Sequence, residues 1–99
     1  MGYRSDVAFA CTEEVYNKNK NVIDAIEASE KKTENGIVSI RWEWVKWYPT
    51  YEEVAAIMKL VEDFPDDTAF VRVGEEEGDI EIKNNPFEFG IGYTQGVYI

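Results

Sequence analysis

Residues 37–48, with the sequence IVSIRWEWVKWY, decide the fold of this chain. Apolar and polar side chains alternate up to Trp44, which is the pattern of a β-strand with one buried face. The alternation then shifts by one residue, because the apolar residues from Val38 to Trp44 are at even-numbered positions, whereas Val45 and Trp47 are at odd-numbered positions. Either a β-bulge near Trp44 and Val45 redirects the side chains, or both faces of the sheet are covered there. We therefore expect at least one of Trp44 and Trp47 to lie away from the helix-covered core.

A helix is expected directly after this strand. Thr50 is followed three residues later by Glu53, a spacing that is typical of a capping box at a helix N-terminus. Pro65 disfavours helical geometry at the residue before it, so the helix should end by residue 64. Apolar side chains recur between these limits at the three- and four-residue spacing of one helical face: Tyr51, Val54, Ile57, Met58 and Val61.

The segment before residue 37 predicts one short strand followed by helical structure. Residues 7–10 are an apolar strand candidate, and Thr12 can cap a helix with Glu13 and Glu14 in its first turn. The apolar helical face continues to about residue 30.

The polar residues 17–21 are poor helix formers, so one helix and two short helices both fit this segment. Lys31 and Lys32 suit a helix C-terminus, and Asn35 and Gly36 supply a turn after it.

The last third of the chain is expected to be mostly strand. Alternating apolar residues predict strands over residues 68–73, 79–83 and 87–93, and residues 97–99 extend the last strand or form another. Residues 74–78 then form a hairpin loop with an acidic tip.

A chain of 99 residues has room for one domain, which we assign to residues 1–99. The element order β-α-β-α-β-β-β predicts an α+β fold. In this fold, two helices pack on one face of a mixed, mostly antiparallel sheet of four to five strands.

The charge of the chain is strongly acidic and unevenly distributed. Twenty acidic and ten basic residues give a net charge of −10, and residues 50–99 contain twelve of the acidic but only three of the basic residues. Such a chain would be repelled by phosphates, which argues against direct nucleic-acid binding and against binding to anionic membranes. The acidic residues either solubilise a small domain or dock on a basic surface of a partner protein, including a surface built for nucleic acid. The candidate partner-binding residues are Glu62, Asp63, Asp66, Asp67, Glu75, Glu76, Glu77, Asp79 and Glu81.

The aromatic residues of the central stretch offer a second candidate interface. Trp44, Trp47 and Tyr48 lie close together in the sequence, and core packing is the default role for such residues. A tryptophan left outside the core would instead suit an interface with another subunit.

Catalysis, metal binding and cofactor binding have little support. The chain has no histidine to activate a serine or the lone cysteine, Cys11, which its apolar neighbours mark as a small buried residue. Residues 75–81 are rich in carboxylates but lack the ligand series of a calcium-binding EF-hand loop. The glycine-rich residues 90–96 have the wrong spacing for a dinucleotide-binding loop. We therefore expect no catalytic residue, no metal and no cofactor.

The first residues carry charges where a signal peptide has an apolar run, and no apolar run approaches the length of about 20 residues that crosses a membrane. These features predict a cytoplasmic protein.

Three patches of sequence carry a resemblance: MGYRSDV at residues 1–7, VKWY at residues 45–48 with Tyr51 and Val54, and FVRVGE at residues 70–75 with DIE at residues 79–81. With these patches the chain resembles a group of small acidic proteins encoded by phages and prophages, whose functions are uncharacterised.

The resemblance implies a location in the cytoplasm of a bacterial host and a class of function, namely an inhibitor that occupies a host defence or nucleic-acid-handling protein. We therefore expect a non-enzymatic binding protein whose acidic second half engages a basic surface, with nucleic-acid mimicry as one form of this function. The alternative is a structural or homo-oligomeric accessory protein that uses the tryptophan-rich strand as its interface.

Overall fold

A computed structural model describes residues 2–94 and 96–99. Two residues named in the sequence motifs lie outside this description: Met1 of the opening patch and Gln95 of the glycine-rich segment. The fold is α+β, as predicted, and its main sheet has five strands in the order β2-β3-β1-β4-β5. All four strand pairs are antiparallel, so the sheet is not mixed. The strands are β1 (Ser5–Thr12), β2 (Glu30–Glu34), β3 (Ile37–Val45), β4 (Thr68–Gly74) and β5 (Ile80–Asn84).

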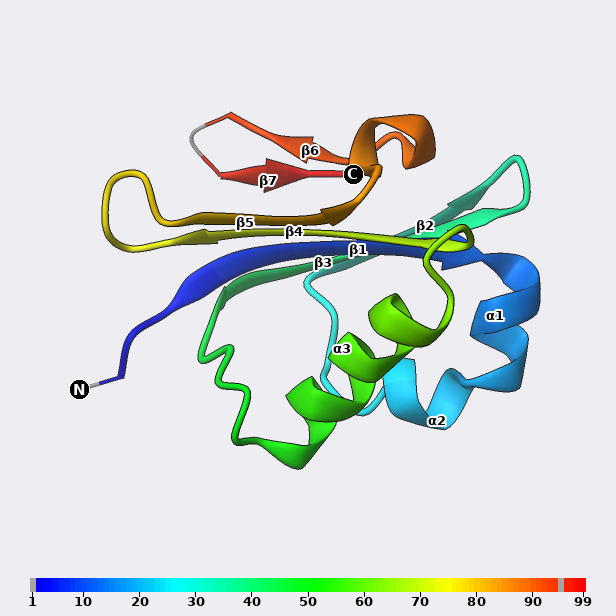
Figure 1. Ribbon diagram of the computed structural model, residues 1–99, viewed down its shortest axis with the longest axis horizontal. Helices are drawn as coiled ribbons and strands as arrows, with labels where there is room; N and C mark the ends of the chain where they lie inside the picture. The colour runs from blue at the N-terminus through cyan, green and yellow to red at the C-terminus, as the bar shows by residue number, and fades with distance from the viewer. Residues whose placement is uncertain (1, 95) are drawn as a thin grey trace.

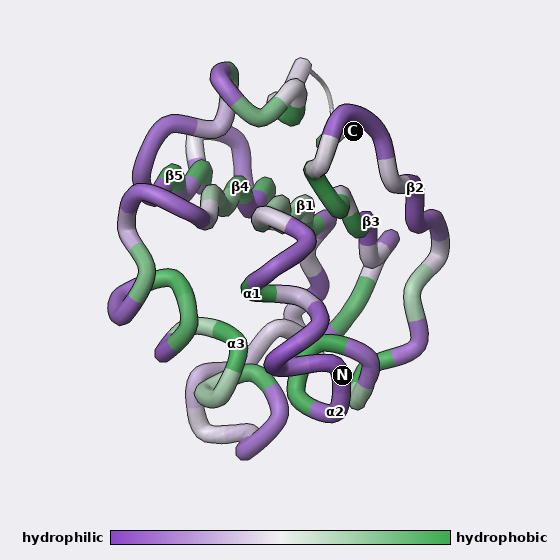
Figure 2. Tube along the Cα trace, turned by 90° about the vertical axis from the view of Figure 1, so that its right-hand side faces the viewer, coloured by the Kyte–Doolittle hydropathy of each residue, from purple (hydrophilic) through white to green (hydrophobic). Residues whose placement is uncertain are grey.

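The main sheet lies between two layers of different construction. Three helices cover one face: α1 (Glu13–Lys18), α2 (Lys20–Ile23) and α3 (Glu52–Asp63) (Figure 1). The number exceeds the two of the predicted fold because the first helical segment forms two short helices, which is one of the two alternatives that its sequence left open. The C-terminal segment lies on the other face (Figure 1). In Figure 2 the sheet crosses the middle of the molecule with the helices below it. The C-terminal layer consists of a 3-10 helix, η1 (Pro86–Phe89), and a small sheet of β6 (Gly92–Tyr93) and β7 (Val97–Tyr98).

The central strand β1 is buried on both of its faces. Phe9 and its alternate neighbours belong to the helix-side core, whereas Ala8 and Ala10 belong to the core under the C-terminal layer. The helix-side core contains a chain of aromatic rings whose successive centroids are 6.5, 5.1 and 5.9 Å apart. These rings belong to Phe9, Trp42, Trp47 and Phe70.

Of the two alternatives for the shift in apolar alternation, the β-bulge is the one present in β3. Asp6 of β1 faces two residues of β3, because Ser5 pairs with Val45 while Val7 pairs with Trp42. Trp44 is the bulged residue: its φ is +55°, and its backbone N–H donates to Asp6 Oδ1 at 2.8 Å. Trp44 is 51% exposed, whereas Trp47 is 7% exposed and belongs to the helix-side core. The prediction that one of these tryptophans lies away from that core is therefore confirmed.

The prediction of helical structure to about residue 30 was wrong. Thr12 does cap α1, since its hydroxyl accepts from Val15 N at 3.4 Å. However, α1 stops at Lys18, and only one short turn, α2, follows it. Lys31 and Lys32 do not end a helix but lie in the edge strand β2, where every side chain is exposed.

The sequence of β2 has no apolar periodicity, so the strand could be predicted only from the turn that follows it. Asn35 and Gly36 both have positive φ, at 54° and 79°, and they join β2 to β3 as a two-residue hairpin. An Asn-Gly pair between strands is the commonest sequence for such a turn.

Helix α3 is present, but its predicted capping box is not. The residue at the N-cap is Tyr51, which makes no side-chain capping bond. Thr50 instead lies inside a turn that is closed by a hydrogen bond from Tyr51 N to Tyr48 O at 3.0 Å. The helix ends at Asp63, two residues before Pro65, as expected.

The β4–β5 hairpin agrees with the prediction to within one residue. The strand predicted over residues 87–93 was wrong except for its last two residues, Gly92–Tyr93, and residues 97–98 form a separate strand, which is one of the two alternatives for this segment. Residues 86–89 form η1 because Pro86 starts a helical turn and Gly90, at φ +79°, ends it. The alternation of apolar residues in this segment does not mark a strand, because Phe87 is 65% exposed while Ile91 is fully buried.

Candidate functional site

Three of the predicted partner-binding residues lie together at one end of the main sheet. Glu75, Glu76 and Glu77 occupy the connection between β4 and β5, and all three side chains are exposed. We call these three residues the acidic turn. Within residues 2–94 and 96–99, none of them forms an ion pair. Consecutive like charges repel one another, so a cationic partner would relieve this repulsion.

A hydrogen-bond network beneath the acidic turn holds it in place. The Tyr3 hydroxyl donates to Asp79 Oδ2 at 2.5 Å and accepts from Glu76 N at 3.0 Å. These contacts join residues that are 76 and 73 positions apart in the sequence. Gly74 permits the close approach, because a side-chain carbon at that position would collide with both the Tyr3 hydroxyl and the Asp79 carboxylate. The turn is therefore attached to the N-terminal segment as well as to its own hairpin.

Arg72 on β4 connects this network to β5. Its guanidinium holds the Asp79 carboxylate with two hydrogen bonds, of 2.9 Å to Oδ1 and 3.2 Å to Oδ2. It also donates to Glu81 Oε1 and to Ser5 Oγ, each at 3.0 Å. Such a bidentate pair fixes both position and orientation. Asp79 and Glu81 were predicted to bind a partner, but the structure pairs both of them with Arg72.

The network shifts the pKa values of its members in opposite directions. Hydrogen bonds from Arg72, and then from Tyr3, hold the pKa of the Asp79 carboxyl below its usual range. The pKa of Tyr3 is raised, because ionisation would remove the proton that its hydroxyl donates to Asp79. The pKa of Arg72 is raised chiefly by its hydrogen bonds to Asp79. The network is therefore built for an ionised carboxylate and a neutral phenol.

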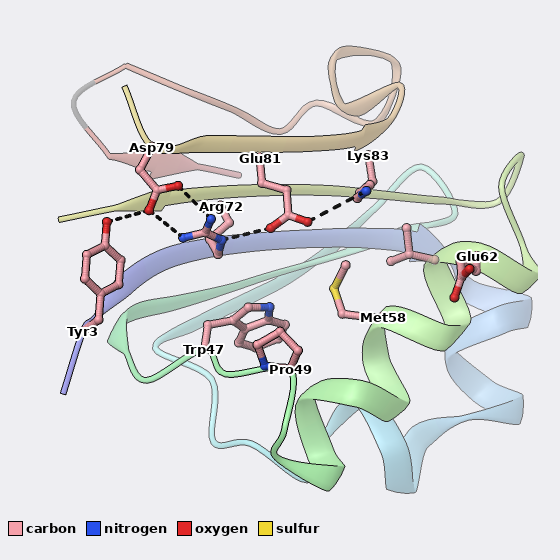
Figure 3. A pocket seen from close by; sticks show the side chains of 10 residues that line it. Tyr3, Trp47, Pro49, Met58, Glu62, Arg72, Asp79, Glu81 and Lys83 are labelled. Atoms are coloured by element: carbon pink, nitrogen blue, oxygen red, sulfur yellow. Dashed lines mark hydrogen bonds and ion pairs between the residues drawn. The ribbon is translucent and has the colours of Figure 1, made fainter. Parts of the chain in front are cut away.

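A groove of about 510 Å³ runs beside the network on the helix side of the sheet. Figure 3 shows charged side chains of β4 and β5 along one wall and apolar side chains of α3 and the segment before it along the other. Tyr3 lies at the end nearest the acidic turn, and Glu62 lies at the far end (Figure 3). The charged wall consists of Arg72, Asp79, Glu81 and Lys83, and the apolar wall consists of Trp47, Pro49, Met58 and Val61.

The remaining acidic candidates do not join the acidic turn. They lie around the end of α3 and the start of β4, whereas the acidic turn follows the end of β4. The seven residues of β4 separate the two groups by about 20 Å. Asp63 is also paired with Lys59 at 3.5 Å. This second group, Glu62, Asp63, Asp66 and Asp67, is exposed.

The aromatic candidates are also separated by the fold. Trp47 is packed between Trp42 and Phe70 in the core, so little of its side chain is available to an interface beyond what lines the groove. Tyr48 is half-buried and packs against Tyr51, with ring centroids 5.1 Å apart. Of the three aromatic candidates, Trp44 is the one that remains half-exposed. The bulge that exposes it was visible in the sequence as the shift in apolar parity.

The groups that could carry chemistry are dispersed. Cys11 is buried in the helix-side core, and burial raises the pKa of its thiol to about 12, so the reactive thiolate is scarce. Within the part of the chain that the structure describes, no three carboxylate or thiol side chains converge as a metal site would need. The expectations of no catalytic residue and no metal remain predictions.

The network around Arg72 is the feature that sequence reasoning missed. Arg72 is distant in the chain from Tyr3 and Ser5, and the pairing of β1 with β4 brings Ser5 to Arg72. Alternation in β4 and β5 could have placed Arg72 and Glu81 on the same face of the hairpin.

Comparisons with models of protein families, with curated protein sequences and with solved structures find no match to this chain. None of the described helices is both long enough and apolar enough to cross a membrane.

Proposed function

We propose that this protein is a non-enzymatic binding protein that docks its acidic turn on a basic surface of a partner protein. The observation that carries the proposal is the support of the turn. The turn carries three exposed carboxylates that have no cationic partner in the described chain. Hydrogen bonds that involve Tyr3 and Arg72 hold the residues next to these carboxylates in place. Because the backbone of the turn is held, the turn loses less conformational entropy on binding than a mobile loop would.

The groove beside the turn adds apolar contact area to this proposal. The side chains of Pro49 and Met58 line it, and methionine adapts readily to different partners. A partner that carries lysine or arginine next to an apolar side chain would place the cation against the acidic turn and the apolar group in the groove. The resemblance to phage-encoded acidic proteins suggests a host protein as this partner, and a nucleic-acid-binding groove is one basic surface of this kind.

The test begins with affinity capture from a bacterial lysate, followed by measurement of the association rate with the captured partner across a salt series. Changing Glu75, Glu76 and Glu77 to Gln should slow association by about tenfold at low salt, and by less at high salt. The matched control is the triple variant Asp63→Asn, Asp66→Asn and Asp67→Asn, which removes the same charge from the second acidic group without changing a residue that lines the groove.

An equal loss of rate in both triple variants would show that only net charge matters, and an unchanged rate would refute the proposal. Competition by a DNA duplex for the captured partner would identify nucleic-acid mimicry as the form of the inhibition.

A second candidate function, homo-oligomerisation through the tryptophan-rich strand, now rests on Trp44 alone. Its side chain is half-exposed, and its backbone is fixed by hydrogen bonds to Asp6 and from Arg4 Nη1 at 3.1 Å. The change Trp44→Ala should then convert an oligomer to monomers without lowering the melting temperature. If the native protein is monomeric at every concentration in light scattering, this candidate is excluded.

A further inference from the structure

The outer edge of β5 offers free backbone groups for another strand. β5 is at the end of the strand order and has a neighbour, β4, on one side only. Gly74 N donates to Asp79 O at 2.8 Å, which identifies position 79 as a hydrogen-bonded pair of this antiparallel ladder. Such pairs alternate along the ladder, so Glu81 and Lys83 direct their backbone groups toward β4. The N–H and C=O of Ile82, together with the C=O of Ile80, therefore point outward.

The side chains of β5 are unusual for an exposed edge. Ile80 and Ile82 are 40% and 43% exposed, on the face of the sheet opposite the groove. The other edge strand, β2, has the sequence EKKTE and carries no apolar side chain. Charged edges of that kind discourage pairing with other strands, whereas exposed apolar edges favour it.

The sequence of β5 is complementary to itself in the antiparallel direction. With Ile82 of two copies facing each other, Glu81 of each copy lies opposite Lys83 of the other. Because Ile82 directs its N–H and C=O outward, the two Ile82 residues would form a hydrogen-bonded pair. Glu81 and Lys83 would then face each other as non-hydrogen-bonded pairs, in which the side chains lie closest. In a single chain, Glu81 Oε2 already lies 3.9 Å from Lys83 Nζ, so pairing would complete a square of alternating charges.

We propose that β5 pairs with β5 of a second copy about a two-fold axis at Ile82, which joins the two main sheets into one sheet of ten strands. The two Ile82 side chains pack together on the face opposite the groove. The acidic turns lie at opposite ends of the joined strands, because the strands run antiparallel, and so they do not repel each other directly. This inference is independent of the function proposed for the acidic turn.

The interface between two five-residue strands is small compared with the 1,200–2,000 Å² or so of stable complexes, so the dimer should be weak and dependent on concentration. Its mass is best followed by sedimentation from micromolar to millimolar protein, at an ionic strength that screens the net charge of each copy. We expect a monomer–dimer equilibrium in the native protein. A protein that stays monomeric over this whole range would overturn the proposal.

The change Lys83→Glu places four carboxylates in the square of charges and should weaken the dimer by about tenfold or more. The matched control is Lys59→Glu, which makes the same change of charge on the exposed side of α3 and should leave the dimer unchanged. Equal weakening by both variants would overturn the proposal, because net charge alone would then explain the result.

Mixing two variants gives the sharpest test. Lys83→Glu and Glu81→Lys should each dimerise poorly, but a mixture of the two should form a heterodimer, since each Glu then faces a Lys. Melting curves verify that the Glu81→Lys variant, which loses a contact to Arg72, is folded. A third variant, Ile82→Pro, removes an N–H that points away from β4 and should abolish pairing while the β4–β5 ladder persists. A dimer that survives Ile82→Pro, or a mixture that stays monomeric, would overturn the proposal.

Discussion

The two faces of the main sheet are covered in opposite ways. On the helix side, β1, β3 and β4 contribute Phe9, Trp42 and Phe70, which pack with Trp47 under the three helices. On the other side the sheet presents smaller side chains, namely Ala8, Ala10, Ala69 and Val71, and Ile91 of the C-terminal layer is buried against them. Large buried side chains contribute most to stability, whereas small ones let a second backbone approach closely. The helix side should therefore determine whether the chain folds, and the C-terminal side should contribute less.

The largest effect is expected at Trp42. Its side chain is fully buried between Phe9 and Trp47, and its indole N–H donates to Ile26 O at 3.0 Å. The change Trp42→Ala should lower the free energy of unfolding by about 3–5 kcal/mol, because it leaves a cavity and an unpaired carbonyl. Urea denaturation measures this change. A loss near 1 kcal/mol would show that the aromatic chain is not the main source of stability.

A smaller loss is expected on the other face. Ile91→Ala should lower the free energy of unfolding by about 2 kcal/mol, at the low end for such a change, because the thin C-terminal layer can settle onto the alanines. Phe87→Ala is the control, since Phe87 is mostly exposed and its loss should change stability by less than about 0.5 kcal/mol. If Ile91→Ala costs as much as Trp42→Ala in the same urea experiment, the two faces contribute equally and the comparison fails.

The same contrast explains how much of the fold the sequence predicts. The α+β class, the β-bulge, helix α3 and the β4–β5 hairpin all follow from apolar periodicity and from Pro65, and α3 and β4 contribute residues to the large helix-side core. Strand β2 has no apolar residue to report its period, so only the Asn35-Gly36 turn could have revealed it. In the C-terminal layer the alternation of Phe87, Phe89 and Ile91 was misleading, because tertiary packing and not strand pairing sets their positions.

The candidate site was predictable only in its local part. Glu75, Glu76 and Glu77 are consecutive, and their position between two apolar strands indicates an exposed turn. The roles of Asp79 and Glu81 depend on Arg72 across the hairpin and on Tyr3 at the other end of the chain. The contact between Tyr3 and Asp79 joins residues 76 positions apart and leaves no periodic trace in the sequence, whereas the pairing of Arg72 with Glu81 follows from alternation across the hairpin and was missed.

The hydrogen-bond network at Asp79, which lies at the border of the helix side, should make a smaller and pH-dependent contribution to the free energy of unfolding. Because the folded state lowers the pKa of Asp79, this group stabilises the protein above its unfolded pKa of about 4, and the stabilisation is lost as the pH falls through the folded value. The raised pKa of Tyr3 acts in the opposite sense: its contribution is present below about pH 10 and is lost as the pH rises through the folded value.

Asp79→Asn should therefore lower the melting temperature at neutral pH and reduce the difference in melting temperature between neutral and acidic solutions. Partial exposure of the carboxylate keeps the effect below that of the core changes. Glu77→Gln is the control, because Glu77 lies outside the network. Identical pH profiles for Asp79→Asn and the native protein would show that the network does not contribute to stability.

The smallest effect, and one of unusual sign, is expected at Trp44, which belongs to neither core. In an ordinary strand, a protein with Gly is less stable than one with Ala at the same position by about 0.5–1 kcal/mol. Trp44 has a φ of +55°, a conformation that costs residues with a Cβ about 1–2 kcal/mol but costs Gly nothing. The hydrogen bond from its backbone N–H to Asp6 is kept in any variant except Pro.

Trp44→Gly should therefore be more stable than Trp44→Ala by up to about 1 kcal/mol, and both should stay close to the native protein in urea denaturation. If Trp44→Ala is the more stable of the two, or if both variants unfold as readily as Trp42→Ala, then Trp44 contributes to the core through its side chain and the contrast between Trp44 and Trp47 is wrong.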